Sequence, residues 1–369
     1  QDAEFTSTRG TRATSDFRLD TDANTENSNY GLYFTDTLKL DPRWTLTLSG
    51  RYNRTHIRIE DRTGLTPALN GSSTYVRFNP AVGINFAPAE KLTAYATYNE
   101  GMRAPTPIEL ACADPNAPCR LPNNFLADPP LKKVVSRTLE AGARGKLRGN
   151  DDWSAAIYRT VLSDDIQFIS AGGAAVNAGY FQNVGRTRRQ GMEFGYTAHA
   201  GKFSAGLRYA YVEATFESSF VVHSPNNSSA DAGGDIQVGP GNRIPGIPRH
   251  NIKLRLDYEF SDTATAGASI NYSSSVFARG DENNRDANGS VPGYVVVNLD
   301  GRVELSRGLE IYARIANLFD RKYANFGVLG ENVFANPGKS FDPNNALPEQ
   351  FRGPGAPRGA WLGLRYKWM

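Results

Sequence analysis

The chain has 369 residues, of which 40% are hydrophobic and 21% are charged, and its formal net charge is +3. The balance of 41 basic and 38 acidic residues gives no reason to expect nucleic-acid binding. We find no run of about 18 apolar residues, the length that a membrane-spanning helix needs. This pattern excludes a helical membrane protein. It does not exclude a membrane β-barrel, whose strands show lipid an apolar side chain only at every second position.

Alternating apolar and polar residues are the dominant pattern of the sequence. The segment 252–260 reads IKLRLDYEF, with charged positions at Lys253, Arg255, Asp257 and Glu259. A pleated strand places the charged and the apolar residues on opposite faces. Few soluble sheets carry such a row of charges on one face of a strand. We therefore expect the charged face to line a water-filled lumen, and Leu254 and Leu256 to face lipid.

The same alternation predicts thirteen strands. In chain order they are 28–40, 43–60, 73–87, 91–103, 135–147, 152–170, 180–198, 203–218, 248–260, 263–278, 291–305, 308–323 and 357–369. Short links alternate with long ones, and the long links are rich in Gly, Asn, Asp, Pro and Ser. Short periplasmic turns and long extracellular loops are typical of outer-membrane barrels, as are Tyr and Trp near the strand ends. The sequence therefore predicts an all-β fold, an antiparallel transmembrane β-barrel.

The strand count predicts how the barrel is organised. Thirteen is odd, whereas bacterial single-chain barrels have an even number of strands. Residues 1–27 are expected to be an extracellular loop or the end of a preceding strand, with a weak strand candidate at Ala3 to Thr8, and residues 28–369 the C-terminal portion of a barrel. The alternatives are a barrel of about fourteen strands or a larger barrel whose N-terminal part this chain lacks. We favour the larger barrel and expect no direct pairing between the first and last strands.

Two polar segments invite a more specific interpretation. Cys112 and Cys119 lie close together in a loop rich in Pro, Asn and Asp, which favours a local disulfide over two free thiols. The four histidines are scattered, so no metal site is predicted, and no cofactor is expected. The loop with Asp281, Glu282 and Asp286 could bind calcium, but it lacks the spacing of a known calcium loop, and we favour a solvated loop.

Five segments stand out as sequences: NPAVGINFAPAEKLTAYATYNEGMRAPTPIEL from Asn79, NVGRTRRQGMEFGYTAHAG from Asn183, RIPGIPRHNIKLRLDYEF from Arg243, LEIYARIANLFDRKY from Leu309 and the ending PRGAWLGLRYKWM. Together they resemble the barrel of TonB-dependent outer-membrane receptors, and the resemblance runs from about Asn29 to the C-terminus. The resemblance implies a 22-stranded barrel with a plugged lumen. One departure is Met369, because family members usually end on the aromatic residue that here is Trp368.

The resemblance also implies a function. It implies a receptor in the Gram-negative outer membrane, with a periplasmic C-terminus, that imports a ferric siderophore or other metal chelate with energy from TonB. The expected partners are outer-membrane lipid and lipopolysaccharide, the chelate, and TonB through an N-terminal region that this chain does not contain. The alternatives are a passive channel of about fourteen strands and a structural or adhesive barrel. A catalytic role is not expected, although His223 lies near Ser218 in a polar loop.

Ligand contacts are expected in the outer loops and the upper lumen. Arginines attract an anionic chelate, and aromatic rings beside polar groups stack on it. Each side chain also has a structural interpretation, either packing of a loop or an ion pair across the lumen. The predicted ligand-binding residues are Arg103, Glu109, Arg186, Arg188, Phe326, Phe334 and Phe341.

Overall fold

The computed structural model describes residues 3–6, 10–13, 22–65, 67–111, 119–120, 131–147, 151–170 and 178–368. Its largest element is an antiparallel sheet to which each of the thirteen predicted strands contributes one strand. In chain order these are β3 (Ala23–Lys39), β4 (Trp44–Asp61), β5 (Gly71–Ala89), β6 (Leu92–Arg103), β8 (Val134–Leu147), β9 (Asp151–Ser163), β12 (Thr187–Ala200), β13 (Phe203–Phe216), β16 (His250–Ser261), β17 (Ala264–Ser273), β18 (Tyr294–Ser306), β19 (Leu309–Ala316) and β22 (Gly359–Tyr366). No helix among the described residues is long and apolar enough to cross a membrane.

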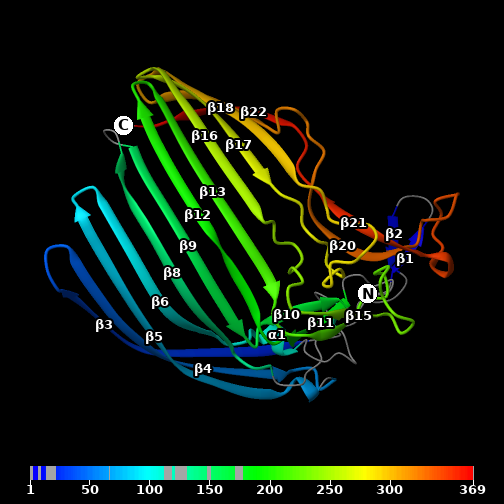
Figure 1. The fold of residues 1–369 in the computed structure, drawn as a ribbon. Coiled ribbons are helices and arrows are strands. Elements are labelled where there is room, and N and C mark those ends of the chain that lie inside the picture. Colours follow the sequence, from blue (N-terminus) through cyan, green and yellow to red (C-terminus); the bar gives the residue numbers. More distant parts are fainter. Residues whose placement is uncertain are drawn as a thin grey trace.

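The sheet is a meander in which every strand pairs with the next sheet strand along the chain. It forms a curved wall with β3 at one edge and β22 at the other (Figure 1). Among the residues that the structure describes, no hydrogen-bonded pair joins these two strands. This arrangement agrees with the expectation for the first and last strands, and the completion of the barrel by further strands stays a prediction.

The links between strands alternate in length, as predicted. At one end of the wall the turns are short: Asp41 Oδ1 accepts hydrogen bonds from the main-chain N–H groups of Arg43 (2.7 Å) and Trp44 (2.9 Å). Gly201 and Gly308 adopt φ values of 59° and 82°, which favour glycine. The described parts of the long links lie at the opposite end, which we call the loop end.

Two predicted strands are interrupted at the loop end, so their prediction as single strands was wrong. The segment 152–170 bends at Asp164, whose φ is 53°, and the segment 180–198 bends at Gly185, whose φ is 78°. Main-chain hydrogen bonds of 2.8 and 2.9 Å connect the two bends through Asp165. Beyond the bends, β10 (Ile166–Ser170) and β11 (Ala178–Asn183) leave the wall and form a small sheet with β7 (Cys119–Arg120).

The long links contain further structure that the sequence pattern did not predict. These elements are the hairpins β14–β15 (Phe220–His223 and Asp235–Val238) and β20–β21 (Ala324–Asn332 and Leu347–Pro354), the 3₁₀ turns η1 (Pro67–Leu69) and η2 (Pro343–Asn345), and the short helix α1 (Pro107–Ala111). Another hairpin, β1–β2 (Ala3–Thr6 and Gly10–Ala13), precedes the wall. Part of the weak candidate at Ala3 to Thr8 is thus a strand, but it pairs within its own hairpin and not with the wall.

The hydrophobic core lies at the loop end. A wall one sheet thick has no interior, so apolar side chains become buried only where loops pack on one another and on the strand ends. The largest buried cluster joins β10 and β11, the end of β13 and the β14–β15 hairpin: Ile169, Tyr180, Val184, Ala214, Phe216, Val222, Ile236, Val238 and Ile244. This core makes the loop end a folded layer that can position binding residues.

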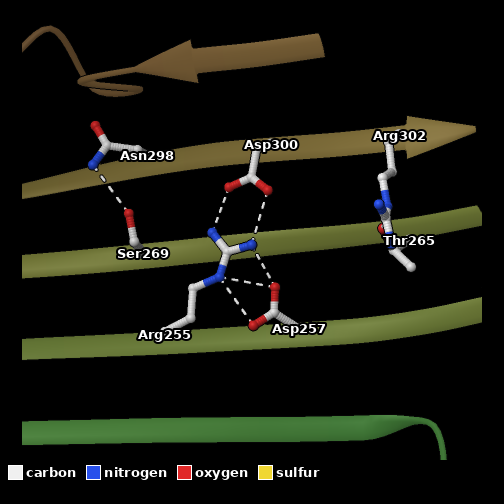
Figure 2. A network of polar contacts seen from close by, with 7 residues as sticks. All are labelled: Arg255, Asp257, Thr265, Ser269, Asn298, Asp300 and Arg302. Atoms are coloured by element: carbon white, nitrogen blue, oxygen red, sulfur yellow. Dashed lines mark hydrogen bonds and ion pairs between the residues drawn. The ribbon is translucent and has the colours of Figure 1, made fainter. Parts of the chain in front are cut away.

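The strand register separates the sheet into a polar and an apolar face, because direct partners in antiparallel strands point to the same side. Leu254 is the partner of Ile270, which is the partner of Val297. One position along, Arg255 is aligned with Ser269 and Asn298, and these residues belong to the polar network in Figure 2. The alternation predicted for the segment 252–260 is therefore confirmed.

Candidate functional site

A polar cleft of about 410 Å³ lies on β3 and β4 beside the segment after β6. The register aligns Asn29 with Thr55 and Gly31 with Asn53, so the cleft opens on the polar face of the wall. Its lining combines amides, hydroxyls and two guanidinium groups: Asn27, Asn29, Tyr30, Gly31, Arg51, Asn53, Thr55, Met102, Arg103, Ala104, Pro105 and Thr106. This lining provides hydrogen-bond donors and positive charge for an anionic ligand.

Arg103 lines this cleft and is held from behind by Glu109. The Arg103 Nη1 to Glu109 Oε2 distance is 2.7 Å, and Arg103 remains 45% exposed whereas Glu109 is only 12% exposed. The same carboxylate accepts a hydrogen bond from the Thr106 main-chain N–H (2.7 Å), while the Thr106 hydroxyl accepts one from the Glu109 N–H (3.3 Å). This reciprocal arrangement is a capping box, which starts helix α1 and fixes Glu109. The structure thus brings Arg103 and Glu109 together, with Glu109 supporting Arg103 from outside the cleft lining.

Arg51 supplies the second guanidinium of the cleft. Its Nε donates to Asn53 Oδ1 at 2.6 Å, and its Cζ lies 5.9 Å from the centre of the Tyr33 ring. Thr55 donates to Asn29 Oδ1 at 2.7 Å and fixes that amide. Arg51 and Asn53 were not predicted as ligand-binding residues. The alternation of their strand placed them on the polar face, but it did not show that a cleft forms there.

Arg186 and Arg188 lie outside the lining of the polar cleft, and their side chains have different surroundings. Arg188 is largely buried, and its Nη2 lies 3.3 Å from Glu217 Oε1 and 3.4 Å from Thr215 Oγ1. Arg186 is exposed, and its main-chain N–H donates to the Ser218 hydroxyl at 2.9 Å. The ion pair of Arg188 fits the structural interpretation of this cluster, whereas Arg186 presents its charge to solvent.

The three predicted aromatic residues belong to the β20–β21 hairpin. Phe326 lies on β20 and is 56% exposed. Phe334 and Phe341 lie in the turn of the hairpin, with ring centres 5.9 Å apart. Their exposed faces offer a stacking surface at the loop end, separate from the lining of the polar cleft.

The predicted disulfide lies outside the described residues. Cys112 is not described, and Cys119 is described only as a main-chain position of β7.

The acidic loop after β17 is not solvated, so that prediction was wrong. Asp281, Glu282 and Asp286 are 1%, 5% and 6% exposed, because this loop packs on the loop that follows β14. Burial raises the pKa of Glu282 to about 7 and also raises the pKa of Asp281.

The curved antiparallel wall is that of a large β-barrel, and comparison with known proteins identifies the family. The model of the TonB dependent receptor-like β-barrel family matches residues 1–318, and the chain belongs to this family. The predicted resemblance is therefore confirmed. Its members are receptors of the Gram-negative outer membrane and not enzymes.

Curated relatives include two metal-related receptors. The probable TonB-dependent siderophore receptor PiuA of Acinetobacter baumannii is 24% identical over 313 residues, which are 83% of this chain and 38% of PiuA. The metal-pseudopaline receptor CntO of Pseudomonas aeruginosa is 29% identical over 171 residues, which are 44% of this chain and 21% of CntO. The chain thus spans less than half the length of either relative.

Solved structures share the fold. The siderophore receptor PiuA from Acinetobacter baumannii superposes with a TM-score of 0.68 and 19% identity, over 94% of this chain and 44% of PiuA. The copper transporter OprC superposes with a TM-score of 0.67 and 20% identity, over 99% of this chain and 51% of OprC. The closed form of the ferric-catecholate import receptor Fiu from E. coli K12 superposes with a TM-score of 0.65 and 18% identity, over 96% of this chain and 46% of Fiu.

Proposed function

We propose that this chain is part of the wall of a receptor that imports a ferric siderophore or another anionic metal chelate across the outer membrane, with energy from TonB. The observation that carries the proposal is the cleft with Arg51 and Arg103 on the polar face at the loop end. Siderophores and related chelators bind metal through anionic oxygens, which guanidinium groups recognise with charge-assisted hydrogen bonds. PiuA, CntO and Fiu are named as siderophore, metal-pseudopaline and ferric-catecholate receptors, which supports the same ligand class.

We propose that further strands of the same protein complete the barrel to 22. The outer edges of β3 and β22 carry main-chain N–H and C=O groups, and each group left unsatisfied in lipid costs several kcal/mol. Chain that precedes Gln1 would pair with these edges and supply the plug and the contact to TonB. A passive channel of about fourteen strands would instead need the described wall to close nearly on itself. In the part of the chain that the structure describes, the outer edges of β3 and β22 have no partner strand, which does not favour that alternative or a small adhesive barrel.

The orientation in the membrane follows from the same wall. The apolar face, which includes Leu254, Ile270 and Val297, would contact outer-membrane lipid and lipopolysaccharide. Lys253, Arg255 and Asp257 would face the lumen. The short turns would be periplasmic and the loop end extracellular. Because β22 runs from the loop end towards the short turns, the C-terminus would lie in the periplasm.

Binding of ferric chelates to the full-length receptor tests this function. We expect Arg51→Gln and Arg103→Gln each to weaken binding of ferric citrate or a ferric tris-catecholate by about tenfold to a hundredfold, since each removes a charged hydrogen-bond donor. Arg302→Gln is the matched control, because Arg302 pairs with Glu310 near the short turns. Unchanged affinity in both cleft variants would contradict this location of the binding site. Failure of the intact receptor to import any metal chelate would contradict the function.

A further inference from the structure

Two outer loops far apart in the sequence form a joint at the loop end. The first loop, 224–230, follows β14, and the second, 278–290, follows β17. Asn227 Nδ2 donates to the Gly280 carbonyl oxygen at 2.9 Å, and the Ser228 N–H donates to Asp286 Oδ2 at 2.9 Å. We call this contact region the loop junction.

The loop junction is polar yet excluded from solvent. Six of its side chains, three acidic and three amide, are more than nine-tenths buried: Asn226, Asn227, Asp281, Glu282, Asn283 and Asp286. Arg279 and Arg285 of the same loop are exposed, and burial raises the pKa of Glu282 more than the positive charge of Arg279 lowers it. Among the described residues, no ion pair involves any of the three acidic side chains.

Two carboxylate oxygens in the loop junction lack a partner. Asp281 Oδ1 accepts hydrogen bonds from the main-chain N–H groups of Arg285 (2.8 Å) and Asp286 (3.0 Å), but Asp281 Oδ2 is buried with no hydrogen bond. Glu282 Oε1 accepts from the Gly280 N–H at 3.0 Å, and Glu282 Oε2 is likewise buried and unpartnered. Buried polar atoms in native proteins nearly always have a partner, so these two oxygens indicate a bound group that carries positive charge.

A neighbouring amide fits the same interpretation. The side-chain nitrogen of Asn226 is buried and has no acceptor. The nitrogen and oxygen of an Asn amide are assigned from their hydrogen bonds, and exchanging the two would place an oxygen where the nitrogen finds no partner. An oxygen at that position would be a third acceptor without a donor, and such a set of acceptors suits a bound cation.

We propose that the loop junction binds a calcium ion, with Asp281 Oδ2 and Glu282 Oε2 as its charged ligands. Within the described part of the chain, no three His, Cys, Asp or Glu side chains are grouped to hold a metal ion. The remaining ligands would therefore be amide and main-chain oxygens, which calcium accepts readily. Magnesium fits less well, because it usually retains several waters, whereas these carboxylates are more than nine-tenths buried. The ion would fasten loops 224–230 and 278–290 to each other, a role that is independent of the proposed transport function.

Titration calorimetry of the EDTA-stripped full-length protein in detergent tests the site. We expect saturable calcium binding to the wild type, weakened about tenfold or more in Asp281→Asn and Glu282→Gln. Both variants keep an oxygen that can accept the main-chain hydrogen bonds. Asp231→Asn is the matched control, because Asp231 caps the exposed β14–β15 turn and should leave calcium binding unchanged.

Hydrogen exchange provides a measurement that does not depend on a variant folding. Amides of 224–230 and 278–290 in the wild type should exchange at least about tenfold more slowly in calcium than in EDTA, since a bound ligand stabilises the state that holds it. Magnesium should give a smaller effect. No calcium binding in the wild type, or equal affinity in Asp281→Asn, would overturn the proposal, and equal protection by magnesium would overturn the assignment to calcium.

Discussion

The guanidinium of Arg255 on β16 reaches across β17 to the carboxylate of Asp300 on β18, with a 2.8 Å distance between Nη2 and Oδ2 (Figure 2). Arg255 Nε also lies 2.8 Å from Oδ1 of Asp257 on its own strand. The bridge passes over Gly267, the register partner of both Asp257 and Asp300. A Cβ at Gly267 would overlap the guanidinium, so the absence of a side chain there is what allows the bridge.

Replacing Gly267 by alanine should therefore destabilise the wall. We expect Gly267→Ala to lower the free energy of unfolding by about 1–3 kcal/mol, because the guanidinium must move from both carboxylates. The measurement is urea unfolding of the full-length protein in lipid vesicles. Gly206→Ala is the matched control, since Gly206 pairs with Arg255 on its other side and has open space at its Cβ position. Equal free energies of unfolding for the two variants would show that the bridge tolerates a side chain at position 267.

A new charge should destabilise the protein on the apolar face of β16 but have little effect on the polar face of β13. Leu254→Lys places a charge on the apolar face and is expected to cost about 2–4 kcal/mol if that face meets lipid near mid-bilayer. Ser204→Lys places the same charge on the polar face, opposite Asp257, and should cost little. Unfolding in vesicles measures both variants. A larger loss for Ser204→Lys than for Leu254→Lys would reverse the assignment of lipid and lumen.

The capping box of α1 should control the stability of the segment that carries Arg103. Thr106→Ala removes the hydroxyl that caps Glu109, and loss of such a cap costs about 0.5–2 kcal/mol. We expect faster hydrogen exchange at Leu110, whose N–H donates to the Thr106 carbonyl oxygen at 3.0 Å. Ile108→Ala changes an exposed side chain of the same helix and serves as the control. Equal exchange in the two variants would indicate that the cap does not hold this segment.

The wall was predictable from sequence because its information is local. Alternation with period two identifies a strand and its two faces without any knowledge of the neighbours. The interruptions were not predictable in this way: Asp164 adopts its positive φ where β9 gives way to β10, and the bend is joined to Gly185, which lies between β11 and β12. Such a bend depends on contacts between segments and leaves the alternation largely intact.

The sites were less predictable, since each depends on segments that are distant in the sequence. Arg51 and Arg103 line one cleft although they lie on β4 and β6, and no local pattern connects them. Asp281 appeared solvated because its neighbours are polar, yet Asn227 of another loop packs over it. By contrast, Arg103 and Glu109 were both predicted as ligand-binding residues. They lie only six residues apart in the sequence, and the structure places their side chains in contact.

We propose above all that these strands are part of a larger receptor wall and not a small closed barrel. Disulfide cross-linking in the full-length protein in outer membranes tests it most directly. Thr35→Cys with Ser49→Cys should cross-link rapidly, because these residues are register partners on β3 and β4 with hydroxyl oxygens 3.0 Å apart. Thr35→Cys combined with a cysteine at Trp361 or Arg365 on β22 should not cross-link. Efficient cross-linking of β3 to β22 would contradict the account and establish a short, closed barrel.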